Sequence, residues 1–248
     1  MIHPTAVIDP KTELDSDVSV GPYALIEGNV RVGSGTDIQG HAVISGQTFI
    51  GKNNRVGYGA IIGSFPQDLS FDPRVSSGVE IGDNNVIREY CTIHRGTREG
   101  SNTVVGSNNF FMVGAHLGHN TRIADCVVLA NNVLLAGYVE IHDRVFIGGG
   151  SVVHQFTRMG AVSLLQGMSG TGKDIPPFSI AIGKNCVAAL TWKNNRQNHC
   201  DRELSYPADS GGAGISTGAR RMSRSNATDV NANSSGAWRA KKPLLQYI

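Results

Sequence analysis

The chain has 248 residues, of which 40% are hydrophobic and 17% are charged, and its formal net charge is +2. This length suffices for a sizeable core, in one large domain or in one domain with a smaller appendage. The charge is too small to predict a nucleic-acid partner. Residues 1–5 hold no basic region that leads into an apolar stretch, and no window is long and apolar enough to span a membrane. We expect a cytoplasmic protein without membrane insertion.

The cysteines predict neither a disulfide framework nor a zinc site. They are four in number, and no two are spaced as C-x-x-C. Free thiols in a reducing compartment are the expectation.

Aliphatic residues recur at every sixth position. The first run is Ile2, Ile8, Leu14, Val20, Ile26, Val32, Ile38, Ile44, Ile50, Val56 and Ile62. The phase resumes at Ile81, Ile87 and Ile93, and then at Val105, Phe111, Leu117, Ile123, Leu129, Leu135, Ile141, Ile147, Val153, Met159 and Leu165. A step of six residues advances about 600° around an α-helix but keeps to one face of a strand. We therefore predict short strands, with three hexads closing each triangular coil.

Stacked coils of this kind form an all-β parallel β-helix, a hexapeptide-repeat solenoid, which we place at residues 1–190 with every strand paired in parallel. Asparagine pairs and glycines fit the corners, because both tolerate positive φ. The pairs are Asn53-Asn54, Asn84-Asn85, Asn108-Asn109 and Asn131-Asn132.

Three segments depart from the repeat. Residues 64–78 and 95–103 interrupt it, and such excursions from a solenoid usually carry binding function, although plain surface loops are the alternative. From Thr191 the hexads end, and serine, asparagine, glycine and arginine dominate. This composition predicts an irregular, poorly ordered tail over residues 191–248.

Several strings occur in an order typical of one family. They are Ile87-Arg88-Glu89, Thr92-Ile93-His94-Arg95-Gly96-Thr97, Ala115-His116-Leu117-Gly118-His119, Leu129-Ala130-Asn131-Asn132, Leu135-Ala136-Gly137, Val153-His154-Gln155-Phe156 and Asp174-Ile175-Pro176-Pro177. Over about residues 2–190 the chain resembles the bacterial UDP-N-acetylglucosamine O-acyltransferases that begin lipid A synthesis.

The resemblance implies a left-handed coil, against the usual right-handed crossover preference. It also implies transfer of an R-3-hydroxyacyl group from acyl carrier protein to the 3-hydroxyl of UDP-N-acetylglucosamine. The implied assembly is a homotrimer with its sites between subunits, and neither a metal nor a bound cofactor is implied.

The same resemblance assigns two catalytic roles. His119 matches the family's catalytic histidine, and a neutral imidazole suits a general base near pH 7. Gly137 occupies the oxyanion position, where a backbone N–H stabilises developing negative charge. The alternatives are a histidine that only forms structural hydrogen bonds and a corner glycine that needs positive φ.

Seven further residues match substrate-binding positions, with plain surface polarity as the alternative. Gln67 and Asp68 match residues that reach the nucleotide sugar, and Gly167 matches the position that sets acyl length, where a missing side chain leaves room for a longer chain. His116, His154 and Gln155 match further substrate-contacting positions, and Tyr138 is expected to bind substrate from a position where the family commonly has a histidine.

The chain also departs from the family pattern. Asn120 stands where an aspartate usually orients the catalytic histidine, so we expect a weaker base. Tyr138 replaces a common second histidine, and Ser70 replaces a basic loop residue. The family's C-terminal helical domain is not recognisable after Asn185.

Three alternative functions follow from these observations. One is a catalytically silent trimer that binds nucleotide sugar or acts as a scaffold. A second is a zinc hydratase on the same fold, with His94, His116 and His119 as ligands from neighbouring chains. The third is the sister enzyme that acts on an already acylated sugar. It normally carries a domain before the repeats, whereas here hexads start at Ile2.

Overall fold

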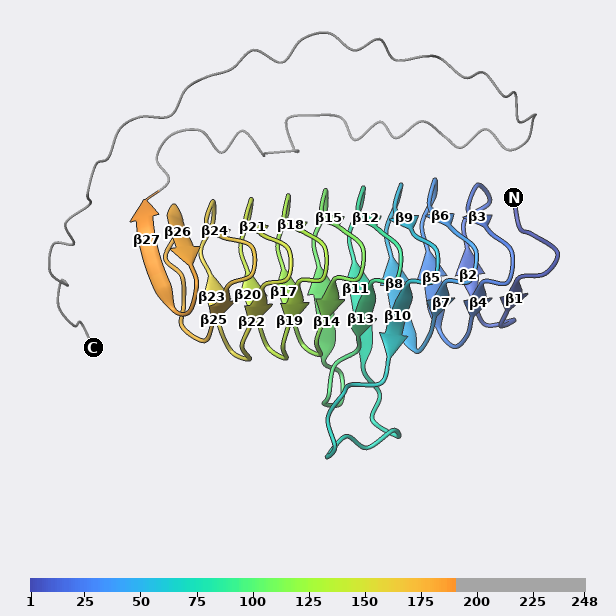
Figure 1. The fold of residues 1–248 in the computed structure, drawn as a ribbon. Coiled ribbons are helices and arrows are strands. Elements are labelled where there is room, and N and C mark those ends of the chain that lie inside the picture. The colour runs from blue at the N-terminus through green and yellow to red at the C-terminus, as the bar shows by residue number, and fades with distance from the viewer. Residues whose placement is uncertain (191–248) are drawn as a thin grey trace, which may run out of the picture. The chain divides into compact units, whose positions relative to one another are not determined.

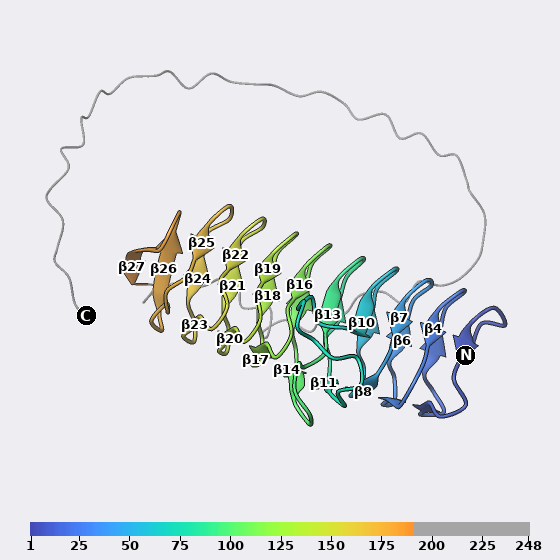
Figure 2. The same cartoon turned by 90° about the horizontal axis from the view of Figure 1, so that it is seen from below.

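The computed structural model describes residues 1–190, which form a solenoid of short strands (Figures 1 and 2). These residues contain no helix, and therefore no helix in this part of the chain that could span a membrane. The predicted tail, 191–248, lies outside the described residues. The predicted hexapeptide-repeat β-helix is confirmed, and its coil is left-handed.

The strands form three sheets, which we call faces 1, 2 and 3. Face 1 contains β1 (Val7–Ile8), β4 (Leu25–Ile26), β7 (Val43–Ile44), β10 (Ile61–Ser64), β13 (Thr92–His94), β16 (His116–Leu117), β19 (Leu134–Leu135), β22 (Val152–Val153) and β25 (Gly170–Thr171). Face 2 contains β2 (Glu13–Leu14), β5 (Val30–Val32), β8 (Gln47–Ile50), β11 (Gly78–Ile81), β14 (Asn102–Val105), β17 (Arg122–Ile123), β20 (Glu140–Ile141) and β23 (Arg158–Met159). Face 3 contains β3 (Ser19–Val20), β6 (Asp37–Ile38), β9 (Arg55–Val56), β12 (Val86–Ile87), β15 (Phe110–Phe111), β18 (Val128–Leu129), β21 (Phe146–Ile147), β24 (Leu164–Leu165), β26 (Ser179–Ile182) and β27 (Cys186–Leu190).

The hexad residues form the core. Leu117 pairs in register with Leu135, eighteen residues later, so three hexads make one coil. The largest fully buried side chains all come from hexad positions: Phe111, Ile26, Ile38, Ile44, Ile50, Ile62, Ile81, Ile87, Ile93, Leu117, Leu129 and Leu135. Each coil therefore places like residues directly over one another, which buries a continuous aliphatic column.

The corners use the asparagine pairs in two ways. Asn53, Asn84 and Asn108 adopt positive φ, as predicted. The second members of these three pairs are buried and link successive coils, because the backbone N–H of Asn85 donates to Asn54 Oδ1 at 2.9 Å and that of Asn109 donates to Asn85 Oδ1 at 2.9 Å. This ladder satisfies polar backbone groups that the corners would otherwise leave unpaired. In the fourth pair the second member, Asn132, is exposed and adopts the positive φ itself.

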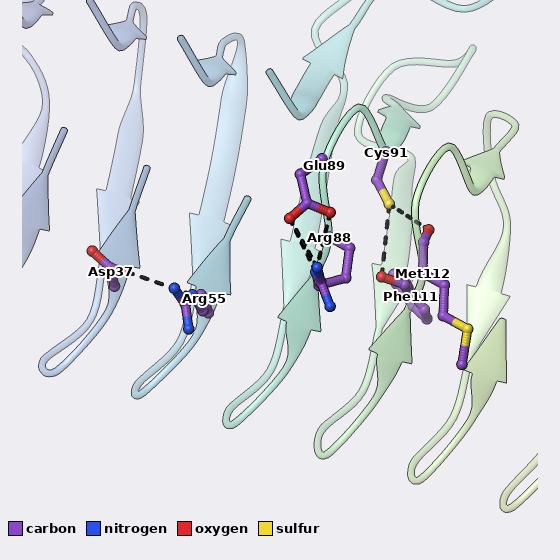
Figure 3. A network of polar contacts seen from close by, with 7 residues as sticks. All are labelled: Asp37, Arg55, Arg88, Glu89, Cys91, Phe111 and Met112. Carbon is purple, nitrogen blue, oxygen red and sulfur yellow. Dashed lines mark hydrogen bonds and ion pairs between the residues drawn. The ribbon is translucent and has the colours of Figure 1, made fainter. Parts of the chain in front are cut away.

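The outer surfaces of the faces differ in polarity. Face 2 presents charged side chains along its length, including the ion pairs Glu13–Arg31 at 3.1 Å and Arg158–Asp174 at 2.7 Å. Face 3 begins with polar residues, among them Asp37 and Arg55 at 3.8 Å (Figure 3), and then turns apolar. Its apolar outward residues are Val86, Phe110, Val128, Phe146, Leu164 and Ile180.

The cysteines occupy different environments. Cys91 is buried beside face 3, where its Sγ lies 3.1 Å from the Met112 carbonyl oxygen (Figure 3), and burial raises its pKa to about 12. Cys91 and Cys186 are free, but Cys126 is disulfide-bonded, so the expectation of free thiols is wrong at that position.

Strand pairing is parallel along the solenoid except at its C-terminal end. There β26 pairs antiparallel with β27, which corrects the prediction that every strand is parallel. Gly183 and Asn185 both adopt positive φ in the connection, and this tight turn reverses the chain instead of starting another coil.

Candidate active site

Two excursions leave the coil next to each other and pack together (Figure 1). The first follows β10, and the second follows β13. The Ser76 backbone N–H donates to the Glu99 carboxylate at 2.9 Å, and the Gly100 N–H donates to the Ser76 carbonyl at 2.8 Å. The Ser77 hydroxyl donates to the Gly96 carbonyl at 2.6 Å. The excursions are therefore one ordered unit.

Arg95, at the start of the second excursion, packs against the first excursion. Its guanidinium carbon lies 4.8 Å from the ring centre of Phe65 and 5.4 Å from that of Phe71, within the range of cation–π attraction. Its Nη2 donates to the Pro73 carbonyl at 3.2 Å. The residue is only 9% exposed, and this burial lowers the pKa of the guanidinium.

A groove of about 1010 Å³ follows the outer surface of face 1. It is lined by Gln67, His94, His116, Gly118, His119, Leu134, Leu135, Ala136, Gly137, Val152, Val153, His154, Gln155, Met168, Gly170, Thr171, Gly172, Gly183, Lys184 and Asn185. Its polar part holds four histidines. Exposed apolar side chains from successive coils, Leu134, Val152 and Met168, extend it beyond them.

The groove brings together most of the predicted site residues. Gln67, His116, His119, Gly137, His154 and Gln155 line it. Asp68, Tyr138 and Gly167 lie outside this lining, and their contact with substrate remains a prediction.

The three residues outside the lining have defined surroundings. Asp68 accepts hydrogen bonds from the Ser70 hydroxyl at 2.7 Å and the Ser70 N–H at 2.9 Å, which lower the pKa of the carboxyl, with a smaller contribution from His119. Gly167 precedes the lining residue Met168 and stacks near Gly149. Tyr138 donates or accepts a hydrogen bond at Thr97 Oγ1, at 3.0 Å.

His119 lies directly over Gly137. A Cβ atom added to Gly137 would come within 2.5 Å of His119 Nε2 and closer still to Cε1. The φ of Gly137 is not positive, so the corner explanation for this glycine is wrong. The position excludes a side chain because the imidazole occupies the space.

The amide of Gly137 has no acceptor within residues 1–190, whereas the Gly118 amide donates to the Leu135 carbonyl at 2.8 Å. Other amides at the same corner are likewise without an acceptor in the described coils. Gly137 differs from them in lying under the His119 imidazole. It therefore offers a free N–H beside a potential base.

His119 is tied to the second excursion through Asn120. Its Nδ1 lies 3.1 Å from Asn120 Oδ1, which also accepts from the Thr97 N–H at 3.0 Å and the Thr97 hydroxyl at 2.9 Å. The Tyr138 ring meets His119 edge to face, with centroids 5.3 Å apart, and stacks on Phe156 at 5.0 Å. Thr97 belongs to the His-Arg-Gly-Thr string, but the family resemblance assigns it no role.

His116 and His94 form a second histidine pair in the groove. Thr92 Oγ1 lies 2.7 Å from His116 Nδ1, and the ring centroids of the two histidines are 5.1 Å apart. His94 Nδ1 donates to the Phe65 carbonyl, because that oxygen can only accept. Within residues 1–190 no three histidine, cysteine or acidic side chains form a metal-binding group.

Burial lowers the pKa of His116 to about 4, with a further contribution from the charge of His94. Between pH 6.5 and pH 4 the His116 imidazole is protonated in the unfolded chain but stays neutral in the folded chain. Stability contributed by the neutral ring is therefore complete above pH 6.5 and decreases as the pH falls toward 4. We expect a loss of roughly 1 to 2 kcal/mol, since the ring is partly exposed.

Denaturant unfolding at pH 7.5 and pH 4.5 measures this loss. The His116→Gln variant, which keeps a polar group for Thr92, should lose less stability over that interval than the wild type. His142→Gln at an exposed site serves as the control. Equal losses in the wild type and His116→Gln would contradict the assignment.

Comparisons with known proteins place the chain beside one group of enzymes. Acyl-[acyl-carrier-protein]–UDP-N-acetylglucosamine O-acyltransferase from Burkholderia orbicola is 51% identical over 183 residues, covering 73% of this chain and 70% of the relative. The protein of the same name from Herminiimonas arsenicoxydans is 47% identical over 190 residues, covering 76% and 72%. No family model matches the chain.

Solved structures of similar proteins share the fold. UDP-N-acetylglucosamine acyltransferase from Campylobacter jejuni has a TM-score of 0.74 at 36% identity, over 83% of this chain and 79% of the other. The Arabidopsis enzyme has a TM-score of 0.72 at 33% identity, over 80% and 77%.

Proposed function

Since this chain belongs to the family of acyl-[acyl-carrier-protein]–UDP-N-acetylglucosamine O-acyltransferases, we propose that it transfers an R-3-hydroxyacyl group in lipid A synthesis. The donor is acyl carrier protein, the acceptor is the 3-hydroxyl of UDP-N-acetylglucosamine, and His119 is the general base. The observation that carries this proposal is His119 placed over the free amide of Gly137, in a groove with an apolar extension.

In the proposed reaction, His119 Nε2 takes the proton of the sugar hydroxyl as its oxygen attacks the thioester carbonyl. The carbonyl oxygen becomes an oxyanion, and the Gly137 N–H donates to it. The intermediate then collapses, the C–S bond breaks, and His119 returns the proton to the leaving thiolate. General-base catalysis contributes about 10² to 10⁴ in rate, and an oxyanion donor contributes about 3 kcal/mol.

The groove divides between the two substrates. The polar part, with Gln67, His116, His154 and Gln155, suits the sugar and its diphosphate, and Asp68 on the adjacent loop suits a sugar hydroxyl. The outward side chains of Leu134 and Val152 are 45% and 46% exposed and continue from this part along face 1. A hydrocarbon chain laid over them removes apolar surface from water at about 25 cal/mol per Å².

The competing function is a catalytically silent nucleotide-sugar binder, which Asn120 favours because it cannot supply the charge of an aspartate. Purified protein incubated with both substrates should give acylated sugar detectable by mass. His119→Ala should lower the rate by at least about a hundredfold. His142→Ala changes an exposed histidine outside the groove and should keep full activity. A wild type without product above the enzyme-free control would favour the silent binder.

The length of the acyl chain provides a second test of the groove. Gly167 has no side chain and a φ that other residues can adopt, so we expect a fourteen-carbon donor to be preferred over a ten-carbon donor. Gly167→Met should reverse this preference by about tenfold or more, because each methylene contributes about 0.8 kcal/mol. Arg122→Met on face 2 is the control. A wild type that prefers the ten-carbon donor would rule out this role.

We propose that the protein is cytoplasmic and forms a homotrimer. The polarity of the three faces supports the trimer. Face 2 carries ion pairs suited to water, although Phe49 is exposed on it. Apolar side chains are exposed on face 1, at Leu134 and Val152, and partly exposed on face 3, at Phe110, Phe146 and Leu164. Packing face 3 of one subunit near face 1 of another would cover the apolar residues of both and close the groove between subunits.

Sedimentation analysis tests this assembly. Phe146 is a partly buried, outward residue of face 3, and Phe146→Glu should yield monomers because it places a charge in an apolar contact. Arg122→Gln on face 2 should remain trimeric. A monomeric wild type, or a trimeric Phe146→Glu variant, would contradict the proposed packing.

A further inference from the structure

The hydrogen bonds around His119 can be assigned a direction at each step. The starting point is the Thr97 backbone N–H, which can only donate and lies 3.0 Å from the Asn120 side chain. The amide atom that receives it must therefore be the oxygen, Oδ1, and not the nitrogen. This removes the usual ambiguity between the two ends of an asparagine side chain.

The direction at His119 follows from that assignment. Asn120 Oδ1 carries no proton, so His119 Nδ1, at 3.1 Å, must be the donor. A neutral imidazole protonated on Nδ1 has its lone pair on Nε2. The Cε1–Nε2 edge of the ring, and not Nδ1, is the part of His119 nearest to Gly137. The network thus presents the basic nitrogen to the groove.

The same logic extends to Tyr138. The only proton of the Thr97 hydroxyl goes to Asn120 Oδ1, at 2.9 Å, so Thr97 Oγ1 is an acceptor toward Tyr138. The Tyr138 hydroxyl, at 3.0 Å, is then the donor. Its ring contacts two others, stacking on Phe156 and meeting His119 in a T-shaped arrangement.

We propose that Thr97, Asn120 and Tyr138 form a neutral positioning network that fixes His119 in the Nδ1–H tautomer. This inference rests on the proposed function for its kinetic consequence, but not for the tautomer itself. The network orients the His119 imidazole as a carboxylate would, but it carries no negative charge. It selects the tautomer that can accept a proton, and it does not add a negative partner for the imidazolium.

The network also gives the second excursion a function. Thr97 lies two residues after Arg95, whose guanidinium packs on Phe65 and Phe71 of the first excursion. Both donors to Asn120 from outside the coil belong to Thr97. The packed excursions therefore hold in place the residue that orients the Asn120 amide.

Side-chain ¹⁵N NMR of the full chain at pH 8 reads the tautomer without turnover. We expect a protonated Nδ1 and an unprotonated Nε2 at His119. Asn120→Gly removes the amide while tolerating the positive φ of this position, and should mix the two tautomers. A wild-type ring protonated on Nε2, or signals unchanged in Asn120→Gly, would overturn the proposal.

Kinetics test the role of each hydroxyl. Thr97→Val should lower kcat about tenfold with little change in KM, Thr97→Ser should restore it, and Tyr138→Phe should cause a smaller loss. Asn120→Asp should move the acidic limb of the pH–rate profile, because it supplies charge. Equal activity of Thr97→Val and wild type would overturn the network. An inactive wild type with the expected tautomer would refute the proposed function and leave the network intact.

Discussion

The eighteen-residue coil is the constraint on which the site depends. Parallel stacking in register places residues eighteen apart directly over one another, whatever their side chains. Asn120, Tyr138 and Phe156 follow this spacing and share positive φ at one corner. His119 and Gly137 follow it one position earlier. The repeat that builds the core thus also brings the proposed base, a free amide and an aromatic stack together.

Positive φ at these corners shows how packing overrides local preference. Asparagine and glycine adopt this conformation readily, and Asn53, Asn84 and Asn108 do so as their type predicts. Tyr138 and Phe156 also adopt positive φ, although aromatic residues do not favour this conformation. Their ring stacking and the backbone bonds between coils offset the strain, which is of order 1 kcal/mol or more for each residue.

The fold could be predicted because its signal is local and repeated. Each hexad independently reports an inward aliphatic residue, so strand type and coil size follow from period alone. The end of the solenoid could not be predicted in this way, because Gly183 and Asn185 form a turn in a single place. The same holds for Thr97. Its bonds to Asn120 depend on how two non-repeating excursions pack, and neither spacing nor composition encodes that packing.

Gly137 and Asn120 have contacts in the folded chain that a residue-by-residue comparison with the family does not predict. For Gly137, positive φ was a reasonable explanation, but the glycine is required by the imidazole above it. Considered singly, Asn120 lacks the charge of the usual aspartate, and Tyr138 lacks the imidazole of the usual second histidine. In the folded chain they meet at Thr97, and each proton between them has one possible direction. Asn120 accepts three hydrogen bonds through Oδ1, and these fix the orientation of its amide without a charge. In the proposed mechanism an asparagine does not stabilise the charged imidazole, so more of the transition-state stabilisation must come from the proposed oxyanion donor, the Gly137 N–H.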